Sequence, residues 1–384
     1  MTVGSRSRTT PRLALLVTVL LATTVACGGG DTDDAAAPTE ETTSSLPAVS
    51  TTEPPAPEDV DAADWEQIEA PADCECSDGT PYRYWIRQAD PTKVLYFLEG
   101  GGACFNAATC GPASPTFTRN LVDRSDDVVP AGGGIFALED ERNPFADWSM
   151  VFVPYCTGDL HLGAKTQDYG EGVVIEHKGA VNARTALDAA AEAFPDAEQV
   201  VVAGSSAGSA GAPLYAGLAH DALPEADITL LADASAAYPD DEGITAAIGA
   251  LWGAFERLPE WPEQTGPPPG AWTLPRMLVQ AGRHVPDMRL ATINSAYDEV
   301  QASFSALIGR TGDLLEMIDA NNALVESEGI DLRTWVGPGT EHTVLGRESF
   351  YTDEVDGTSL RDWVADLVAG EDVPDVHCTE CAAR

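Results

Sequence analysis

Residues 199–211 read Gln199-Val200-Val201-Val202-Ala203-Gly204-Ser205-Ser206-Ala207-Gly208-Ser209-Ala210-Gly211. After Gln199 the residues Val200 to Ala203 form a continuous apolar run, and residues 199–203 are therefore predicted to form a strand buried on both faces. Gly-x-Ser-x-Gly follows at 204–208, and a helical pattern opens directly after it. In this setting small residues permit a tight turn that projects Ser206 away from the sheet. Ser206 is therefore a candidate nucleophile; the alternative is a small-residue turn where a helix packs closely on a sheet.

Similar apolar runs recur along the chain and alternate with Ala-rich amphipathic stretches. The other predicted strands are 94–98, 150–153, 228–232, 289–293 and 332–336, and the clearest helical stretches are 179–194 and 299–308. Continuous apolar strands separated by helices predict an α/β fold, with a mostly parallel central sheet flanked by helices. In such sheets function collects in the loops at the carboxyl ends of the strands.

A serine nucleophile needs a base, and that base needs an acid to fix its tautomer. His342 lies in a Gly/Pro loop just after strand 332–336, although a histidine in such a loop can also be a surface residue. Asp298 follows strand 289–293 and Asp233 follows strand 228–232. Either aspartate gives the serine–acid–base order of α/β-hydrolases, so order leaves the choice of acid open.

Three consecutive glycines, Gly100 to Gly102, follow strand 94–98. Their backbone N–H groups are unshielded by side chains, as donors to a tetrahedral oxyanion must be. We expect the oxyanion hole to use the amides of Gly101 and Gly102 together with that of Ala207, the residue after the serine. A phosphate-binding loop would need Lys and then Ser or Thr after the glycines, and Ala103-Cys104 supplies neither.

The composition excludes several classes of protein. The 384 residues carry 21 Lys+Arg against 62 Asp+Glu, a formal charge of −41, which would repel the phosphates of a nucleic acid. Apolar residues make up 44% of the chain, enough to bury a large core and to exclude general disorder. We expect residues 64–384 to form a single catalytic domain.

The first 63 residues look like an export signal and a tether. Arg6, Arg8 and Arg12 precede a short apolar stretch that ends in small residues at Ala26, as in a signal peptide. Cys27 follows in a setting that resembles a bacterial lipobox, so residues 1–26 are predicted to be a lipoprotein signal peptide and Cys27 the lipidated residue. The alternative is an ordinary cleaved signal with a spare thiol. Residues 27–63 are rich in Thr, Pro and acids and predict a solvated tether.

The cysteines agree with export. Seven remain beyond Cys27: Cys74, Cys76, Cys104, Cys110, Cys156, Cys378 and Cys381. Outside the cytoplasm cysteines tend to pair, but an odd number cannot all do so. The terminal Cys-x-x-Cys has no second ligand pair with metal spacing, so a structural disulfide is favoured over a zinc site. We expect neither a metal nor a cofactor.

Several motifs together resemble the pectin acetylesterase/Notum family. They are 98–105 (Leu-Glu-Gly-Gly-Gly-Ala-Cys-Phe), 153–159 (Val-Pro-Tyr-Cys-Thr-Gly-Asp), 204–208, 297–301 (Tyr-Asp-Glu-Val-Gln), Asn143-Pro144 before Trp148, and Glu341-His342 leading to 356–360. The resemblance implies an α/β-hydrolase-like fold and metal-free serine esterase chemistry. Matched residue by residue, it makes Ser206 the nucleophile, His342 the base and Asp298 the acid, with Asp233 an active-site or structural acid.

The same resemblance implies disulfides between Cys76 and Cys156 and between Cys104 and Cys110. Cys74, Cys378 and Cys381 then share one bond and leave one free thiol. Two departures from the family pattern, at Ser209 and at Gly102-Ala103, leave the shape of the acyl pocket open.

These observations predict an exported serine carboxylesterase, held to the bacterial cell envelope only through its lipid. Its substrate would be an O-acyl ester, foremost an acetyl ester, of a carbohydrate or another small ester. Polyanionic pectin fits the charge poorly. The Trp-rich stretch 252–272 would form a lid or a sugar-stacking wall, or else an inserted surface loop. The competing functions are a non-catalytic substrate-binding lipoprotein and an inactive esterase relative.

Overall fold

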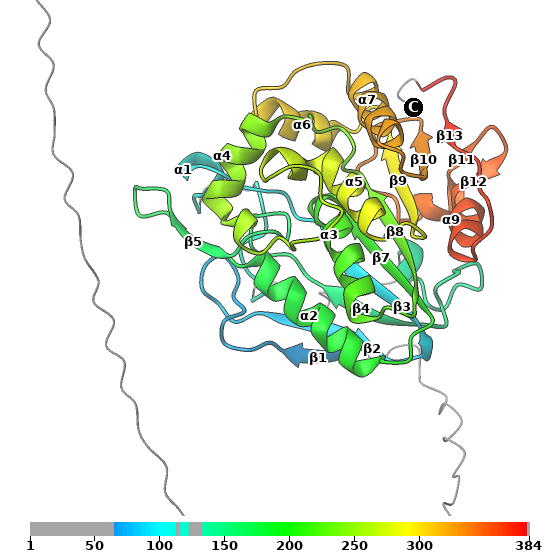
Figure 1. Cartoon of the computed structure of the whole chain (residues 1–384), viewed down its shortest axis with the longest axis horizontal. Coiled ribbons are helices and arrows are strands. Elements are labelled where there is room, and N and C mark those ends of the chain that lie inside the picture. The colour runs from blue at the N-terminus through cyan, green and yellow to red at the C-terminus, as the bar shows by residue number, and fades with distance from the viewer. Residues whose placement is uncertain (1–64, 113–115, 123–132, 382–384) are drawn as a thin grey trace, which may run out of the picture. The chain divides into compact units, whose positions relative to one another are not determined.

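The computed structural model describes residues 65–112, 116–122 and 133–381 (Figure 1). These residues belong to one unit that spans Pro55–Arg384. The predictions for the signal peptide, for the tether and for Cys27 fall outside the described residues. No helix in the described ranges is long and apolar enough to cross a membrane.

A nine-stranded sheet organises the described residues, in the order β1-β2-β4-β3-β7-β8-β9-β10-β13. Its strands are β1 (Trp65–Glu69), β2 (Arg83–Arg87), β3 (Asp90–Leu98), β4 (Trp148–Val153), β7 (Gln199–Ser205), β8 (Asp227–Asp233), β9 (Arg289–Ser295), β10 (Leu332–Gly337) and β13 (Val376–His377). Strands β4 to β13 in this order pair in parallel, whereas β1, β2 and β4 pair antiparallel. Two short hairpins, β5 (Lys165–Asp168) with β6 (Val174–His177) and β11 (Glu354–Val355) with β12 (Thr358–Ser359), lie outside it.

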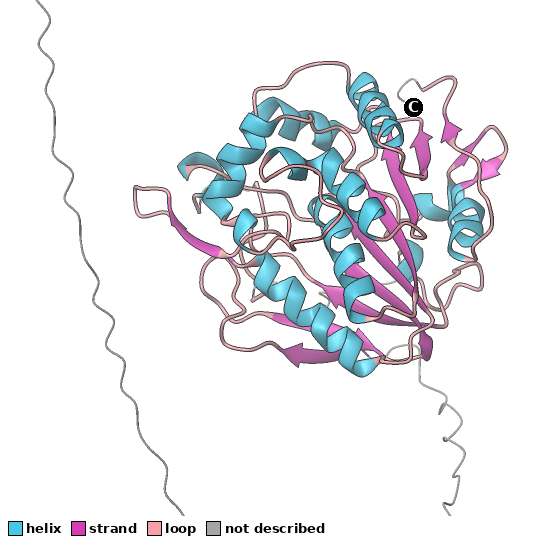
Figure 2. Cartoon of the chain, viewed as in Figure 1, coloured by secondary structure: helices cyan, strands magenta, loops and turns pink. Residues whose placement is uncertain are grey.

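Helices cover both faces of the sheet, and Figure 2 shows the strands fanning out among them. The α-helices are α1 (Ala107–Cys110), α2 (Gly179–Ala193), α3 (Ala207–Ala222), α4 (Glu242–Trp252), α5 (Leu274–His284), α6 (Glu299–Leu307), α7 (Leu314–Ser327), α8 (Ser349–Thr352) and α9 (Leu360–Val368). Val202 of β7 belongs to the core under α2, α3 and α5, while its neighbour Val201 belongs to the opposite core. On that opposite face Trp363 of α9 packs on Trp335 of β10, with ring centroids 5.8 Å apart.

The predicted fold class is confirmed, and the six predicted strands appear as β3, β4 and β7 to β10. The antiparallel edge was not predicted, because β1 (Trp-Glu-Gln-Ile-Glu) and β2 (Arg-Tyr-Trp-Ile-Arg) carry charged residues and lack the continuous apolar character of the central strands. The β5–β6 hairpin was also missed, since its strands hold few β-formers.

Disulfides join Cys76 to Cys156, Cys104 to Cys110 and Cys378 to Cys381, and Cys74 is a buried free thiol. The first two pairs are those that the family resemblance implied. The third pairs the two terminal cysteines, and it leaves Cys74 as the odd thiol.

Candidate active site

Ser206 occupies a strained turn between β7 and α3. Its backbone has φ 55° and ψ −116°, a left-handed conformation that non-glycine residues seldom adopt. The small residues around it are required by close packing: a Cβ on Gly208 would lie 2.0 Å from the Leu98 carbonyl oxygen of β3. The chain thus forms the sharp strand–turn–helix that presents a serine at the edge of a sheet.

A direct hydrogen bond joins His342 to Asp298. His342 Nδ1 lies 2.7 Å from Asp298 Oδ2, and Asp298 is fully buried. The carboxylate is also fixed from behind, because Asp298 Oδ1 caps helix α6 and accepts the backbone N–H groups of Val300 (2.9 Å) and Gln301 (3.0 Å). A carboxylate can only accept, so Nδ1 carries the hydrogen and Nε2 presents its lone pair.

Asp233 binds the backbone of the His342 loop and the Ser205 hydroxyl, not the imidazole. Its Oδ2 accepts the Val344 and Leu345 backbone N–H groups, both at 3.0 Å, and the Ser205 hydroxyl at 2.9 Å. Burial raises the pKa of Asp233 to about 6, while these hydrogen bonds act to lower it. Its backbone carbonyl also accepts the N–H of Ser206 at 2.7 Å. Asp233 therefore ties the loop that carries His342 to the serine turn, whereas Asp298 contacts the imidazole itself.

The glycine loop lies against the serine turn. A Cβ on Gly100 would come within 2.6 Å of the Ser205 carbonyl oxygen and 2.9 Å of Ser206 Cβ. Gly102 has φ +83°, and a Cβ there would lie 2.0 Å from the Thr116 carbonyl oxygen. Only glycine fits at these positions. Gly102 and Ala103 line the same cavity as Ser206 and Ala207, so two of the three proposed amide donors, Gly102 and Ala207, border the same space as Ser206.

An apolar cavity of about 130 Å³ opens beside Ser206. Most of its wall comes from aliphatic and aromatic side chains: Phe105, Leu160, Leu162, Tyr238, Ile244, Ile248, Trp252, Phe255, Leu258, Trp272, Leu274, Met277, Phe304 and Ile308. Such a lining favours an apolar ligand group.

The Trp-rich stretch 252–272 forms part of that wall. Trp252 and Trp272 line the cavity, and Trp261 packs against α3, where a Cβ on Gly217 would lie 2.4 Å from its ring. All three indoles are buried, with 5%, 6% and 3% exposure for Trp252, Trp261 and Trp272. They therefore do not form an exposed surface on which a sugar could stack.

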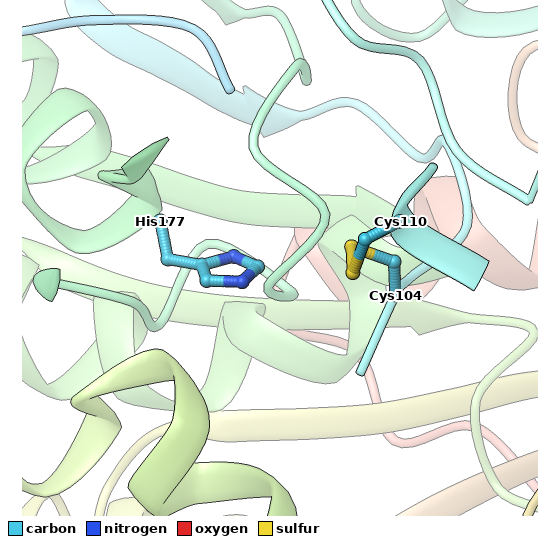
Figure 3. Close-up of side chains that lie close together, drawn as sticks. All are labelled: Cys104, Cys110 and His177. Carbon is cyan, nitrogen blue, oxygen red and sulfur yellow. A yellow bond between two sulfur atoms is a disulfide. The ribbon is translucent and has the colours of Figure 1, made fainter. Parts of the chain in front are cut away.

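Two Cys/His clusters in the described residues could be mistaken for metal sites. Figure 3 shows Cys104, Cys110 and His177 side by side, with the two sulfurs bonded to each other. His177 Nδ1 lies 2.9 Å from the Thr157 carbonyl oxygen, and its Nε2 lies 2.9 Å from the Tyr169 hydroxyl. The second cluster, His377 with Cys378 and Cys381, is likewise closed by a disulfide. Sulfurs held in disulfides are not thiolate ligands, so the donor sets present do not suit zinc.

Apart from the Trp-rich stretch 252–272, the apolar residues of the cavity wall were not identified from the sequence. Helix α4 contributes Ile244, Ile248 and Trp252, and α6 contributes Phe304. One signal was available: α4 reads Glu-Gly-Ile-Thr-Ala-Ala-Ile-Gly-Ala-Leu-Trp, which is too apolar for a helix with an ordinary solvated face.

Comparisons with known proteins fit this architecture. Residues 61–250 match the family model described as Pectinacetylesterase. The inactive palmitoleoyl-protein carboxylesterase notum1b of Danio rerio is 34% identical over 109 residues, which are 28% of this chain and 76% of that protein. The chain belongs to the pectin acetylesterase/Notum family.

Other members of the pectin acetylesterase/Notum family match a shorter share of their own length. The palmitoleoyl-protein carboxylesterases notum2 of Xenopus laevis and NOTUM of Homo sapiens are 33% and 32% identical over 144 and 141 residues. Each alignment covers 35% of this chain and 28% of the relative. The solved structure of the Wnt deacylase Notum from Drosophila superposes with a TM-score of 0.59 at 18% identity, covering 82% of this chain and 97% of that one, and shows that the fold is shared.

Proposed function

We propose that this chain is a serine carboxylesterase that works through an acyl-enzyme. The observation that carries the proposal is the buried Asp298 carboxylate bonded to His342 Nδ1, in a loop that Asp233 fastens to the turn of Ser206. These hydrogen bonds support the tautomer and orientation of the imidazole and the backbone conformation of the turn that carries Ser206. The family also contains an inactive relative, so membership alone does not supply the activity.

The proposed reaction uses these groups in two half-reactions. The Ser206 hydroxyl attacks the ester carbonyl carbon while His342 Nε2 takes its proton. The oxyanion is held by the amides of Gly101, Gly102 and Ala207. Collapse breaks the bond to the alcohol oxygen, which leaves with the proton from His342. Water then attacks the acyl-enzyme with His342 again as base, and the carboxylic acid leaves as Ser206 regains its proton.

The apolar cavity beside Ser206 is evidence on the length of the acyl group in the substrate. An acetyl group, the sequence-based expectation, would contact few of the aliphatic and aromatic side chains that line the cavity, whereas a longer hydrocarbon chain would cover more of this apolar surface and exclude water from it. Two of the matched relatives are named for a palmitoleoyl substrate, a long unsaturated acyl group. We therefore favour an ester with an acyl chain longer than acetyl.

A chain-length series tests both parts of the proposal. p-Nitrophenyl esters from acetate to palmitate would be offered to the wild type, Ser206→Ala and Ser205→Ala. We expect kcat/KM to peak beyond acetate and to vanish with Ser206→Ala, while Ser205→Ala keeps turnover. No hydrolysis above the buffer rate would favour the binding lipoprotein or the inactive relative, and hydrolysis that does not depend on Ser206 would reject Ser206 as the nucleophile. A maximum at acetate would support the serine esterase but reject the longer acyl group.

The net charge of −41 suggests a second comparison on polysaccharides. Acetylated polygalacturonate is a polyanion, so at low salt a strongly acidic enzyme should act on it more slowly than on a neutral acetylated glycan. The difference should shrink as salt rises. Faster release of acetate from the polygalacturonate at low salt would contradict the charge argument.

Export and anchoring also belong to the proposal. The disulfides of the described residues suit an oxidising compartment, which agrees with a signal over residues 1–26 and lipidation at Cys27. With Cys27→Ser we expect the chain to move from the membrane fraction to the soluble extracytoplasmic fraction. An unchanged distribution would reject the lipid anchor.

A further inference from the structure

We propose that His161, which has no part in the proposed reaction, is a positioning residue for the oxyanion loop. This inference rests on the proposed esterase function and adds a residue to its machinery. His161 is 1% exposed, and its Nε2 lies 2.8 Å from the backbone carbonyl oxygen of Glu99. Glu99 immediately precedes the glycine loop Gly100–Gly102. The imidazole therefore holds the first peptide of that loop.

Because a peptide group is planar, the hydrogen bond from His161 to the Glu99 carbonyl also orients the start of the glycine loop. A carbonyl oxygen only accepts, so Nε2 of His161 carries the hydrogen. In a planar trans peptide the C=O of Glu99 and the N–H of Gly100 point in opposite directions. Fixing the carbonyl consequently fixes the plane of the peptide that enters the loop. Gly100 is also the glycine that touches the serine turn, so a rotation of this peptide would displace the loop from Ser206.

Backbone strain is a second indication that the position of the imidazole has a functional role. Leu160 and His161 are consecutive left-handed residues, with φ 58° and 59°. Bulky residues seldom adopt this conformation, and backbone strain of this kind is concentrated at functional sites. Two tyrosine hydroxyls secure the pair: the Tyr155 hydroxyl accepts the Leu160 N–H at 2.8 Å, and the Tyr215 hydroxyl donates to the His161 carbonyl at 2.6 Å.

Tyr155 links the imidazole to the second glycine. Its ring lies 4.8 Å from the His161 ring, and a Cβ on Gly101 would come within 2.5 Å of Tyr155 Cδ1. The Tyr155 N–H also donates to the Glu99 carboxylate at 2.9 Å. Glu99 is thus held at its backbone carbonyl by His161 and at its carboxylate by the Tyr155 N–H, while Gly101 packs against the Tyr155 ring.

The charge state of His161 suits this role. Burial lowers its pKa to about 4, so the imidazole is neutral near pH 7. A neutral side chain can fix the loop through one N–H without placing a full charge beside the reacting ester.

The test replaces His161 with side chains that keep or lose the donor. In the full chain, His161→Gln retains an N–H that can reach the Glu99 carbonyl, and His161→Leu fills the space without one. The measurements are kcat and KM on a p-nitrophenyl ester, the inhibition constant of a trifluoromethyl ketone of matching acyl length, and the melting temperature. The ketone forms a tetrahedral adduct with Ser206, so it reports on the oxyanion hole.

We expect His161→Leu to lower kcat by about 10²–10³-fold, the usual loss for a displaced oxyanion donor, with KM little changed. The ketone should weaken by a similar factor, and His161→Gln should recover at least part of both losses. The matched control is His177→Leu, which removes another buried, neutral histidine that holds a backbone carbonyl, that of Thr157. It should lower the melting temperature yet leave ketone affinity within a few fold.

The positioning role would be overturned if His161→Leu and His177→Leu weakened ketone binding equally. It would also be overturned if His161→Gln recovered neither kcat nor ketone affinity. If His161→Leu does not fold, His161→Asn replaces it. The asparagine side chain is too short to reach the Glu99 carbonyl, so this variant should lose the hydrogen bond that His161→Gln retains. A wild type without Ser206-dependent hydrolysis would instead overturn the proposed function, so the two failures are distinguishable.

Discussion

His342 Nδ1 and Asp298 Oδ2 lie 2.7 Å apart, and the carboxylate has no exposure to solvent. Because Asp298 also caps helix α6, it cannot turn away from the imidazole without leaving backbone N–H groups unpaired. The Gln301 side chain adds a third donor, with Nε2 at 3.1 Å from the same oxygen that faces His342. The helix thus determines the direction in which the imidazole points.

This arrangement predicts the effect of Asp298→Asn. An amide nitrogen facing His342 Nδ1 would favour the opposite tautomer and leave Nε2 without a lone pair, so kcat should fall by about 10⁴-fold, as in comparable triads. Steady-state kinetics on a p-nitrophenyl ester measures it. A loss below tenfold would show that Asp298 is not the acid of the reaction.

Asp233→Asn is the matched comparison for the second acid. It removes one of two carboxylate oxygens that hold Val344 and Leu345, so we expect a loss of stability of about 1–3 kcal/mol from unsatisfied N–H groups. Activity should fall less than with Asp298→Asn. Denaturant unfolding and kinetics on the same two preparations give the answer, and a reversed order of activities would exchange the roles of the two acids.

Filling the cavity should change the acyl preference. Ile248 lines the wall from α4, and Ile248→Trp should lower kcat/KM for a decanoyl ester by about tenfold or more while sparing the acetyl ester. Ala247→Trp is the control, because Ala247 is exposed on the same helix and does not line the cavity. Equal losses for both ester lengths with Ile248→Trp would mean that the acyl chain binds elsewhere.

The buried histidines predict a pH dependence of stability. Burial lowers the pKa of His161 and of His177 from 6.5 to about 4, so between these values the unfolded chain binds protons that the folded chain does not. Their contribution is complete above pH 6.5 and is lost as the pH falls toward 4. Asp159 and Asp233, whose pKa burial raises to about 6, act in the opposite direction below that pH.

His177→Gln isolates one of these contributions. Relative to the wild type, its free energy of unfolding should rise steadily as the pH is lowered from 6.5 to 4. Urea unfolding of both proteins across this range measures the difference. A difference that does not change with pH would show that His177 is not a buried neutral imidazole.

The disulfides should differ in their effect on stability because the loops they close differ in length. Cys76 and Cys156 are 80 residues apart in sequence, whereas Cys378 and Cys381 are three apart. Loop-closure entropy predicts a loss of about 4–5 kcal/mol when both cysteines of the long pair become Ala, and about 1–2 kcal/mol for the short pair. Unfolding of the two double variants compares them directly, and equal losses would contradict the argument.

The sequence predicted the parallel centre of the sheet and the order of the candidate site residues. Both could be predicted because a buried strand is a continuous apolar run, and the candidate residues come directly after such runs. Strand 199–203, its turn at Ser206 and the loop of His342 are all of this kind. The choice between Asp298 and Asp233 was not accessible from order alone. Both follow strands. The family resemblance favoured Asp298, and the hydrogen bonds in the structure separate Asp298, the partner of the imidazole, from Asp233, which holds backbone N–H groups.

The rest depended on contacts between distant segments. The cavity wall joins α4, α6 and the Trp-rich stretch, which no local periodicity relates to Ser206. Similarly, the contact of His161 with Glu99 spans 62 residues and relies on a left-handed backbone that the Leu160-His161 sequence does not announce. Charged edge strands such as β1 escaped prediction because they lack the apolar run.

We propose the Ser206 hydroxyl as the single activated nucleophile of the site. Fluorophosphonate labelling followed by peptide mass spectrometry distinguishes it from its neighbour, because Ser205 and Ser206 are adjacent and Ser205 already donates to Asp233. We expect a single adduct on Ser206, lost in Ser206→Ala and in His342→Ala but kept in Ser205→Ala. An adduct on Ser205, or a wild type that takes no label, would contradict it.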